Sequence, residues 1–187
     1  MRQVIEGLHA ADTVERLARA GEDIRQLTGN LLAQGVGAEP LTRTIASLND
    51  ALSRRAIDLV LARHDLDGID WCWLALGSEG RGEQTFATDQ DNALLFSAAE
   101  DGDTEASRAR LLAFARDVNA CLDTLGFPLC TGNVMASNAE LCLTTEEWKA
   151  KFLAWIRAPT PQALLNASIF FDFRALYGEA DLARGLP

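Results

Sequence analysis

Ligands for zinc are scarce in this chain. Its 187 residues include only two histidines and four cysteines, and no two cysteines form a C-x-x-C pair. A structural zinc site needs four closely spaced cysteine or histidine ligands, so the sequence offers no zinc spacing. We therefore expect the cysteines to be reduced thiols in the core of a cytoplasmic protein.

Long apolar runs are also missing. No stretch approaches the roughly 20 apolar residues that a membrane-spanning helix requires. The first six residues, MRQVIE, lack the apolar core of a secretory signal peptide. These absences predict a soluble, internal protein without a membrane partner.

Basic residues are outnumbered. The chain has 17 lysines and arginines against 27 aspartates and glutamates, which gives a net charge of −10. Non-specific binding to nucleic acid depends on clustered lysine and arginine, so we do not expect nucleic acid as a partner. A nucleotide that arrives with its own metal ion is not excluded by this charge.

Helical patterns occupy the first third of the chain. With 48% hydrophobic residues the chain can bury a full core, and one domain with a helical extension is the expected organisation. Residues 1–64 predict helices, interrupted at 35–40, and a long amphipathic helix follows the interruption because apolar residues recur every three or four positions. We place a helical segment at 1–64 and a second unit at 65–187.

The second unit mixes strands and helices. Apolar runs at 71–76 and 93–96 predict two buried strands, and Leu129-Cys130 is expected to open another. A helix is expected over 104–125. Thr144 and Glu147 form a possible capping box for a further helix, whose aromatic face favours core packing over base stacking. The segment 164–174 is long enough for a helical turn followed by a strand.

A glycine-rich turn and two aspartates lie between the first two strands. Gly77 and two further glycines allow the backbone to turn sharply, and a helix that begins near Ser78 would direct its free N–H groups at an anion. Because side chains alternate along a strand, Asp89 and Asp91 are expected to share one face. Paired carboxylates are suitable ligands for magnesium, which prefers hard oxygen atoms.

The amino-acid sequence of this region resembles that of a known family. Residues 77–84, GSEGRGEQ, and 88–93, TDQDNA, are similar to the nucleotidyltransferase family that accompanies CBS or cyclic-nucleotide-binding domains in bacterial signalling proteins. This family is related to the PII-protein uridylyltransferase, within the DNA polymerase beta-like superfamily. Further similarity lies at 132–138 and 165–174, and the resemblance covers roughly residues 41–187.

The resemblance implies a fold and a reaction. The fold is α+β (α/β), a nucleotidyltransferase core in which helices flank a short mixed sheet, preceded by the N-terminal helical segment. The implied enzyme uses Mg²⁺ or Mn²⁺ and moves a nucleoside monophosphate from a nucleoside triphosphate to a hydroxyl acceptor, expected on a regulatory protein. The alternative is a non-catalytic nucleotide-binding module that reports through attached sensor domains. A C-terminal helical domain is expected to follow the core, so the chain is interpreted as truncated.

Metal ligation is assigned to three carboxylates. Asp89 and Asp91 supply the minimum, and the superfamily pattern implies a third from a neighbouring strand, for which Asp172 is the candidate. An unpaired charge inside its apolar surroundings would be costly unless it faced a cation or a cleft. The competing interpretation is a salt bridge between Asp172 and Arg174.

Nucleotide binding is assigned to the residues around the turn. Gly77 and Ser78 are expected to contact the β- or γ-phosphate, although Ser78 can also serve as an ordinary helix cap. Arg81 is expected to counter the triphosphate charge, while Glu83 can pair with it and brace the turn. Thr88 and Asn92 flank the acids and are expected to orient them.

Overall fold

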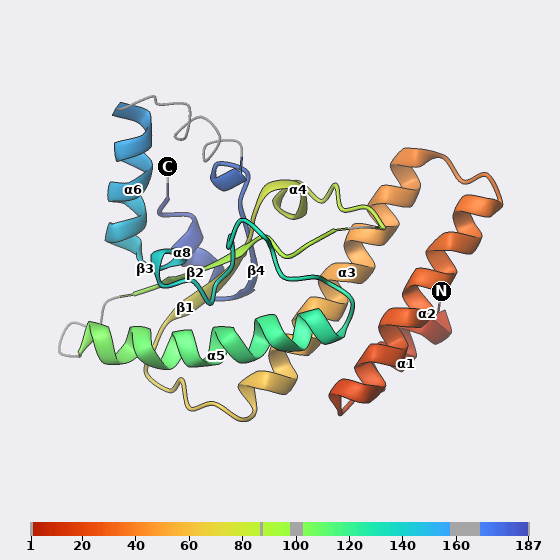
Figure 1. Ribbon diagram of the computed structural model, residues 1–187, viewed down its shortest axis with the longest axis horizontal. Helices are drawn as coiled ribbons and strands as arrows, with labels where there is room; N and C mark the ends of the chain where they lie inside the picture. The colour runs from red at the N-terminus through yellow and green to blue at the C-terminus, as the bar shows by residue number, and fades with distance from the viewer. Residues whose placement is uncertain (1, 87, 98–102, 158–168, 187) are drawn as a thin grey trace.

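A four-stranded mixed sheet forms the centre of the protein (Figure 1). The computed structural model describes residues 2–86, 88–97, 103–157 and 169–186. In the order β3-β2-β1-β4, β1 pairs antiparallel with both β2 and β4, and β2 pairs parallel with β3. The strands are β1 (Trp71–Ala75), β2 (Asn92–Phe96), β3 (Cys142–Thr144) and β4 (Arg174–Gly178). The predicted α+β architecture is confirmed.

Helices cover both faces of this sheet. Alternate residues of β1 contribute to two separate hydrophobic clusters, because successive side chains of a strand point to opposite faces. Trp71 and Trp73 belong to the cluster with the N-terminal helices and α5, whereas Cys72 and Leu74 belong to the cluster with α6 and α8. The helices are α1 (Arg2–Ala10), α2 (Val14–Ala33), α3 (Ala38–Leu61), α4 (Gly77–Gly80), α5 (Thr104–Thr124), α6 (Thr145–Arg157) and α8 (Ala180–Ala183), with a 3-10 turn, η1, at Ala139–Leu141.

The N-terminal helices α1–α3 agree with the expected helical segment. Thr13 caps α2 by accepting a hydrogen bond from the Arg16 amide, and the chain turns back between α2 and α3. Leu17 and Ile57 of these helices are fully buried in the same cluster as Phe114 of α5. The segment therefore packs into the core beside the sheet. Its assignment as a unit separate from 65–187 stays a prediction.

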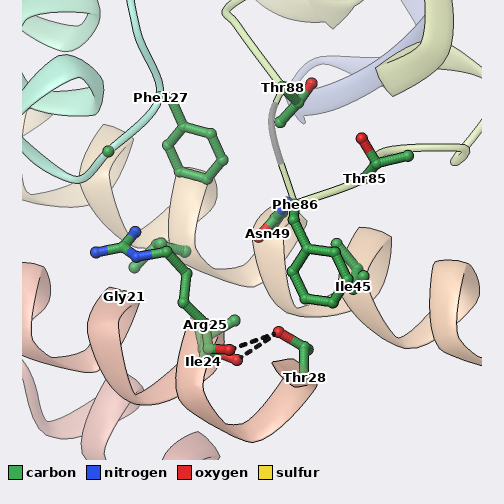
Figure 2. Close-up of a pocket in the computed structure, with 12 residues that line it drawn as sticks. Gly21, Ile24, Arg25, Thr28, Ile45, Asn49, Thr85, Phe86, Thr88 and Phe127 are labelled. Carbon is green, nitrogen blue, oxygen red and sulfur yellow. Dashed lines mark hydrogen bonds between the residues drawn. The ribbon is translucent and has the colours of Figure 1, made fainter. Parts of the chain in front are cut away.

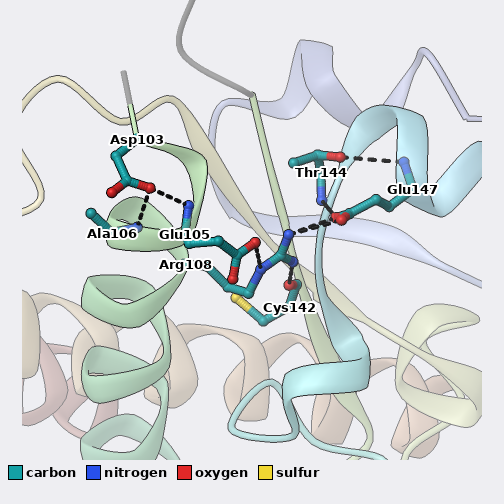
Figure 3. Close-up of polar contacts among 7 residues, drawn as sticks. All are labelled: Asp103, Glu105, Ala106, Arg108, Cys142, Thr144 and Glu147. Carbon is teal, nitrogen blue, oxygen red and sulfur yellow. Dashed lines mark hydrogen bonds and ion pairs between the residues drawn. The ribbon is translucent and has the colours of Figure 1, made fainter.

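A buried arginine joins α5 to the edge of the sheet (Figure 3). Arg108 is only 9% exposed, and it donates to the Cys142 carbonyl and to both carboxylate oxygens of Glu147, at 2.8 and 3.0 Å. The Glu147 carboxylate also accepts a hydrogen bond from the Thr144 amide, and the Thr144 hydroxyl accepts one from the Glu147 amide. This confirms the predicted capping box. The network fixes the short strand β3 and the start of α6 against α5.

Two strand predictions are wrong. Leu129 and Cys130 lie in a loop, and the strand that follows α5 is β3, which consists of only three residues. Strand β2 begins at Asn92, so Asp89 and Asp91 precede the strand and do not lie within it. The expected helical turn at 164–168 lies outside the described residues, although 169–170 are helical and β4 follows at Arg174. None of the described helices is long and apolar enough to cross a membrane.

Candidate functional site

One helical turn, α4, follows directly from the end of β1. Gly77 adopts a φ of 54°, and the Gly80 and Arg81 amides donate to the carbonyls of Leu76 and Gly77. A side chain is disfavoured at this φ, and a β-carbon on Gly77 would lie 3.5 Å from the Asp91 carboxylate. The glycine therefore lets the backbone pass close to one of the three predicted metal ligands.

The carboxylate of Asp91 lies half-buried beside this turn. The Leu76 amide donates to the Asp91 carbonyl at 3.0 Å, which holds the two segments together. Burial raises the pKa of Asp91, and the negative charge of Asp89 raises it further, whereas a hydrogen bond from the Cys130 thiol opposes the shift. Asp89 itself is exposed. The structure thus brings two carboxylates near enough to repel each other at the end of β1.

A buried network of amide side chains holds the backbone of the acidic segment. Gln90 is 2% exposed and donates to the carbonyls of Asn119 and Phe127 at 3.0 and 2.8 Å. Asn119 in turn donates to the side-chain oxygens of Gln90 and Asn92, at 2.7 and 3.0 Å. Asn92 points into the core, where its side chain also accepts from the Ala136 amide. It can act on the acids only through the backbone.

Arg81 connects the end of the turn to two carboxylates. Its Nε lies 2.7 Å from Glu83 Oε2, and its Nη1 lies 2.5 Å from Asp172 Oδ2. The predicted brace between Arg81 and Glu83 is therefore present. The alternative pairing of Asp172 with Arg174 is wrong, because Asp172 precedes β4 and Arg174 pairs with Asp50 of α3 at 2.6 Å.

Glu79 lies on the buried side of the same turn. It is only 8% exposed. Burial and the nearby charge of Asp50 raise the pKa of Glu79 to about 8, an effect that Arg174 partly opposes. This burial favours the neutral form of the Glu79 carboxyl group. Without this protonation a buried negative charge would lie next to the proposed phosphate site.

The segment that leads into the acids lies over the N-terminal helices (Figure 2). Phe86 and Thr88 line a cavity of about 30 Å³ together with Ile45 of α3 and Phe127. The Thr88 hydroxyl donates to the Asp89 carbonyl at 3.4 Å, so its contact with the acids is a weak one to the backbone. Within the described part of the chain, the Ser78 hydroxyl has no hydrogen-bond partner, and Leu76 occupies the cap position of α4.

The three predicted metal ligands, Asp89, Asp91 and Asp172, do not form a metal-binding cluster in the described part of the chain. Within residues 2–86, 88–97, 103–157 and 169–186, no group of three or more His, Cys, Asp or Glu side chains is arranged to hold a metal ion. Magnesium usually takes only one or two protein carboxylates together with phosphate oxygens and water. The mutual repulsion that raises the pKa of Asp91 is the kind of strain that a bound cation relieves. Asp89 and Asp91 therefore stay candidate ligands for such a cation, with phosphate oxygens and water completing its coordination.

A comparison with protein families identifies the chain. Residues 22–162 match the family described as Putative nucleotidyltransferase DUF294. The chain belongs to this family. The match includes α4, Asp89 and Asp91, and it ends before Asp172 and Arg174. A comparison with curated proteins finds no match.

Two residues near the glycine turn and the acids escaped the sequence analysis. Cys130 contacts Asp91 because the loop after α5 runs beside the acids, where the Gln90 amide donates to the Pro128 carbonyl. Asp50 reaches the site from a helix that the sequence assigned only to the N-terminal extension. Neither position stands in a local motif. The one available signal was the isolated charge of Arg174 at the start of an apolar strand.

Proposed function

We propose that the protein transfers a nucleoside monophosphate from a nucleoside triphosphate to a hydroxyl group, with Mg²⁺ or Mn²⁺ as the cofactor. The proposal rests mainly on one observation. The half-buried carboxylate of Asp91 lies against Gly77 at the end of β1, and the charge of Asp89 raises its pKa. Such a pair, next to a turn that admits close backbone approach, suits a metal-bound triphosphate.

The chemistry requires an attack on the α-phosphorus. The acceptor oxygen forms the new P–O bond, the bond to the β-phosphate oxygen breaks, and pyrophosphate leaves with its electrons. A bound divalent cation would stabilise the charge on the attacking and leaving oxygens. In this proposal Asp89 and Asp91 hold the cation, and one of these carboxylates accepts the acceptor's proton.

The remaining candidates have roles in nucleotide binding. Ser78 offers its hydroxyl to the β- or γ-phosphate, beside the backbone of Gly77. Arg81 directly follows α4, and its side chain is 40% exposed. It can exchange the Asp172 carboxylate for a phosphate group, because a guanidinium binds both with similar geometry. Asp172 is paired with Arg81 in this structure, so its proposed role as a third metal ligand requires that Arg81 releases it and that it moves toward Asp89 and Asp91. Glu83, Thr88 and Asn92 hold the turn and the acidic segment in place.

The acceptor is proposed from the family resemblance. In related uridylyltransferases the accepting hydroxyl belongs to a tyrosine of a small regulatory protein, which supports a protein acceptor here. Sensor domains of the CBS or cyclic-nucleotide-binding type are proposed as partners, in a longer chain or as separate subunits. The choice among nucleotides is left to the binding experiment.

The experiment compares two Asp-x-Asp pairs of the same chain. Asp89→Asn with Asp91→Asn removes the proposed ligands, and Asp65→Asn with Asp67→Asn changes an exposed pair outside the turn. Thermal unfolding is measured with each nucleoside triphosphate, with and without Mg²⁺ or Mn²⁺. A ligand at about 100 times its dissociation constant adds roughly 2.7 kcal/mol to the unfolding free energy, so binding gives a clear rise in the midpoint.

The expected result is a metal-dependent rise in the wild type and in the control pair, and none in Asp89→Asn/Asp91→Asn. Pyrophosphate release is then measured with the nucleotide that binds. A rise that persists in this double variant contradicts the metal assignment. Binding without pyrophosphate release, tested with protein acceptors, favours the non-catalytic regulatory module.

A further inference from the structure

Arg174 joins three elements at the edge of the proposed site. It is the first residue of β4, and its Nη2 lies 2.6 Å from Asp50 Oδ1 on α3. The same guanidinium donates twice to the backbone carbonyl of Glu79 in α4, from Nε at 3.2 Å and from Nη2 at 3.0 Å. An ion pair and two hydrogen bonds of Arg174 therefore connect helix α3 to the glycine turn.

The Glu79 carbonyl accepts hydrogen bonds both from Arg174 and from within the turn. It also accepts a hydrogen bond from the Gly82 amide at 3.1 Å, where the chain leaves α4. Because α4 has only four residues, it has little hydrogen bonding of its own to fix its direction. The orientation of Ser78 and Gly77 therefore depends on contacts from outside the turn.

We propose that Arg174 is a positioning residue for the phosphate-binding turn, and that Asp50 anchors it. Helix α3 then takes part in the site through Arg174, a residue that lies far from the glycine motif in the sequence. The inference rests on the proposed function in so far as the turn binds phosphate. Arg174 acts through the backbone of Glu79 and is not placed in contact with the substrate.

The ion pair of Arg174 with Asp50 is more buried than that of Arg81 with Asp172. The side chain of Asp50 is 15% exposed and that of Arg174 is 29% exposed, whereas Arg81 and Asp172 are 40% and 44% exposed in their pair. Charged hydrogen bonds shielded from water are stronger than exposed ones, and removal of one partner leaves the other charge buried without compensation. The anchor should therefore be rigid where the Arg81 pair can exchange partners.

The alternative is that Arg174 merely fastens α3 to β4. Two other contacts already do so: Arg54 Nε donates to the Leu176 carbonyl at 2.9 Å, and the Tyr177 hydroxyl donates to Asp58 at 2.6 Å. Neither contact includes a residue of α4. They provide matched controls, because their loss loosens the same helix and strand without touching the turn.

The experiment measures the turn directly. Amide hydrogen exchange is recorded for Gly80, Arg81 and Glu83, whose amides donate to carbonyls within the turn. The variants are Arg174→Gln and Asp50→Asn, with Arg174→Lys as the conservative change and Tyr177→Phe as the control. Asp50→Asn retains the guanidinium, so it carries the test if Arg174→Gln does not fold. Metal-dependent nucleotide binding is measured on the same proteins.

Positioning predicts a selective effect. Exchange at the three amides should become about tenfold faster in Arg174→Gln and Asp50→Asn, less so in Arg174→Lys, and remain unchanged in Tyr177→Phe. Nucleotide affinity should fall about tenfold in the first two variants, a usual effect for residues that orient ligand-binding groups. Equal exchange in Arg174→Gln and Tyr177→Phe overturns the inference. If the wild type binds no nucleotide, the proposed function fails, and the exchange result still decides whether Arg174 holds the turn.

Discussion

Gly80 packs directly against the backbone of Asp172. A β-carbon on Gly80 would lie 2.0 Å from the Asp172 carbonyl oxygen and 3.1 Å from the Ala75 carbonyl oxygen. Both obstacles are backbone atoms, which cannot rotate away as the end of a side chain can. The glycine turn and the segment before β4 therefore fit together only if residue 80 has no side chain.

Gly80→Ala is expected to be strongly destabilising and to weaken nucleotide binding. The added methyl group must push α4 and the Asp172 segment apart, and overpacking of this kind costs about 1–3 kcal/mol or more. The measurement is urea unfolding together with metal-dependent nucleotide binding.

The control is Gly29→Ala in α2, where nothing lies within 4 Å of the added β-carbon. Alanine in a helix is more favourable than glycine by roughly 0.5–1 kcal/mol, so this control should gain stability. A Gly80→Ala protein as stable as the wild type would contradict the close packing against Asp172.

The sequence predicted the elements whose signals are local. Strand β1 and helix α3 followed from apolar runs and helical spacing. The glycine turn and the two acids were placed between one pair of strands, and the structure adds that Gly77 lies beside Asp91. Strand β3 escaped because three residues show no alternation, and its parallel pairing with β2 depends on a distant partner. The contact of Arg174 with Asp50 joins positions 124 apart, and no local pattern predicts such a contact.

Asn119→Ala is expected to destabilise the protein by about 2–4 kcal/mol. The change leaves the oxygens of Gln90 and Asn92 without this donor and the Ser137 amide without its acceptor, and each buried unsatisfied polar group costs about 1–3 kcal/mol. Chemical denaturation measures the loss. Asn30→Ala on the exposed face of α2 is the control and should have little effect. A small loss for Asn119→Ala would mean that the network does not hold the acidic segment.

Arg81→Gln should separate binding from stability. Its ion pairs are substantially exposed, so their loss should have little effect on the unfolding free energy. If Arg81 binds the triphosphate, nucleotide affinity should nevertheless fall by tenfold or more, about 1.4 kcal/mol. Calorimetric titration with the preferred nucleotide and metal measures this affinity.

Arg43→Gln is the matched control for Arg81→Gln. Arg43 of α3 lines a surface pocket together with Arg81 and Glu83, and it forms an exposed pair with Glu39 at 2.6 Å. It should lose neither stability nor affinity. Similar losses of affinity in both variants would indicate a general effect of charge and would count against a specific contact with Arg81.

Glu79→Gln should change how stability depends on pH. Burial, followed by the charge of Asp50, raises the pKa of Glu79 in the folded protein to about 8, from an ordinary value of 4.5. The folded state thus binds this proton more tightly than the unfolded state does. The stabilisation from protonation is complete below pH 4.5 and is lost as the pH rises to about 8, with a slope of at most about 1.4 kcal/mol per pH unit.

Unfolding is therefore measured from pH 5 to pH 9 for the wild type, Glu79→Gln and Glu140→Gln. Glutamine keeps the size of the side chain and cannot ionise, so the stability of Glu79→Gln relative to the wild type should rise steadily up to about pH 8 and then level off. Glu140 is exposed on η1, and Glu140→Gln is the control for the loss of one carboxylate elsewhere in the chain. Parallel curves for the wild type and Glu79→Gln would show that Glu79 ionises normally, and the turn would then carry a negative charge beside the phosphate site at neutral pH.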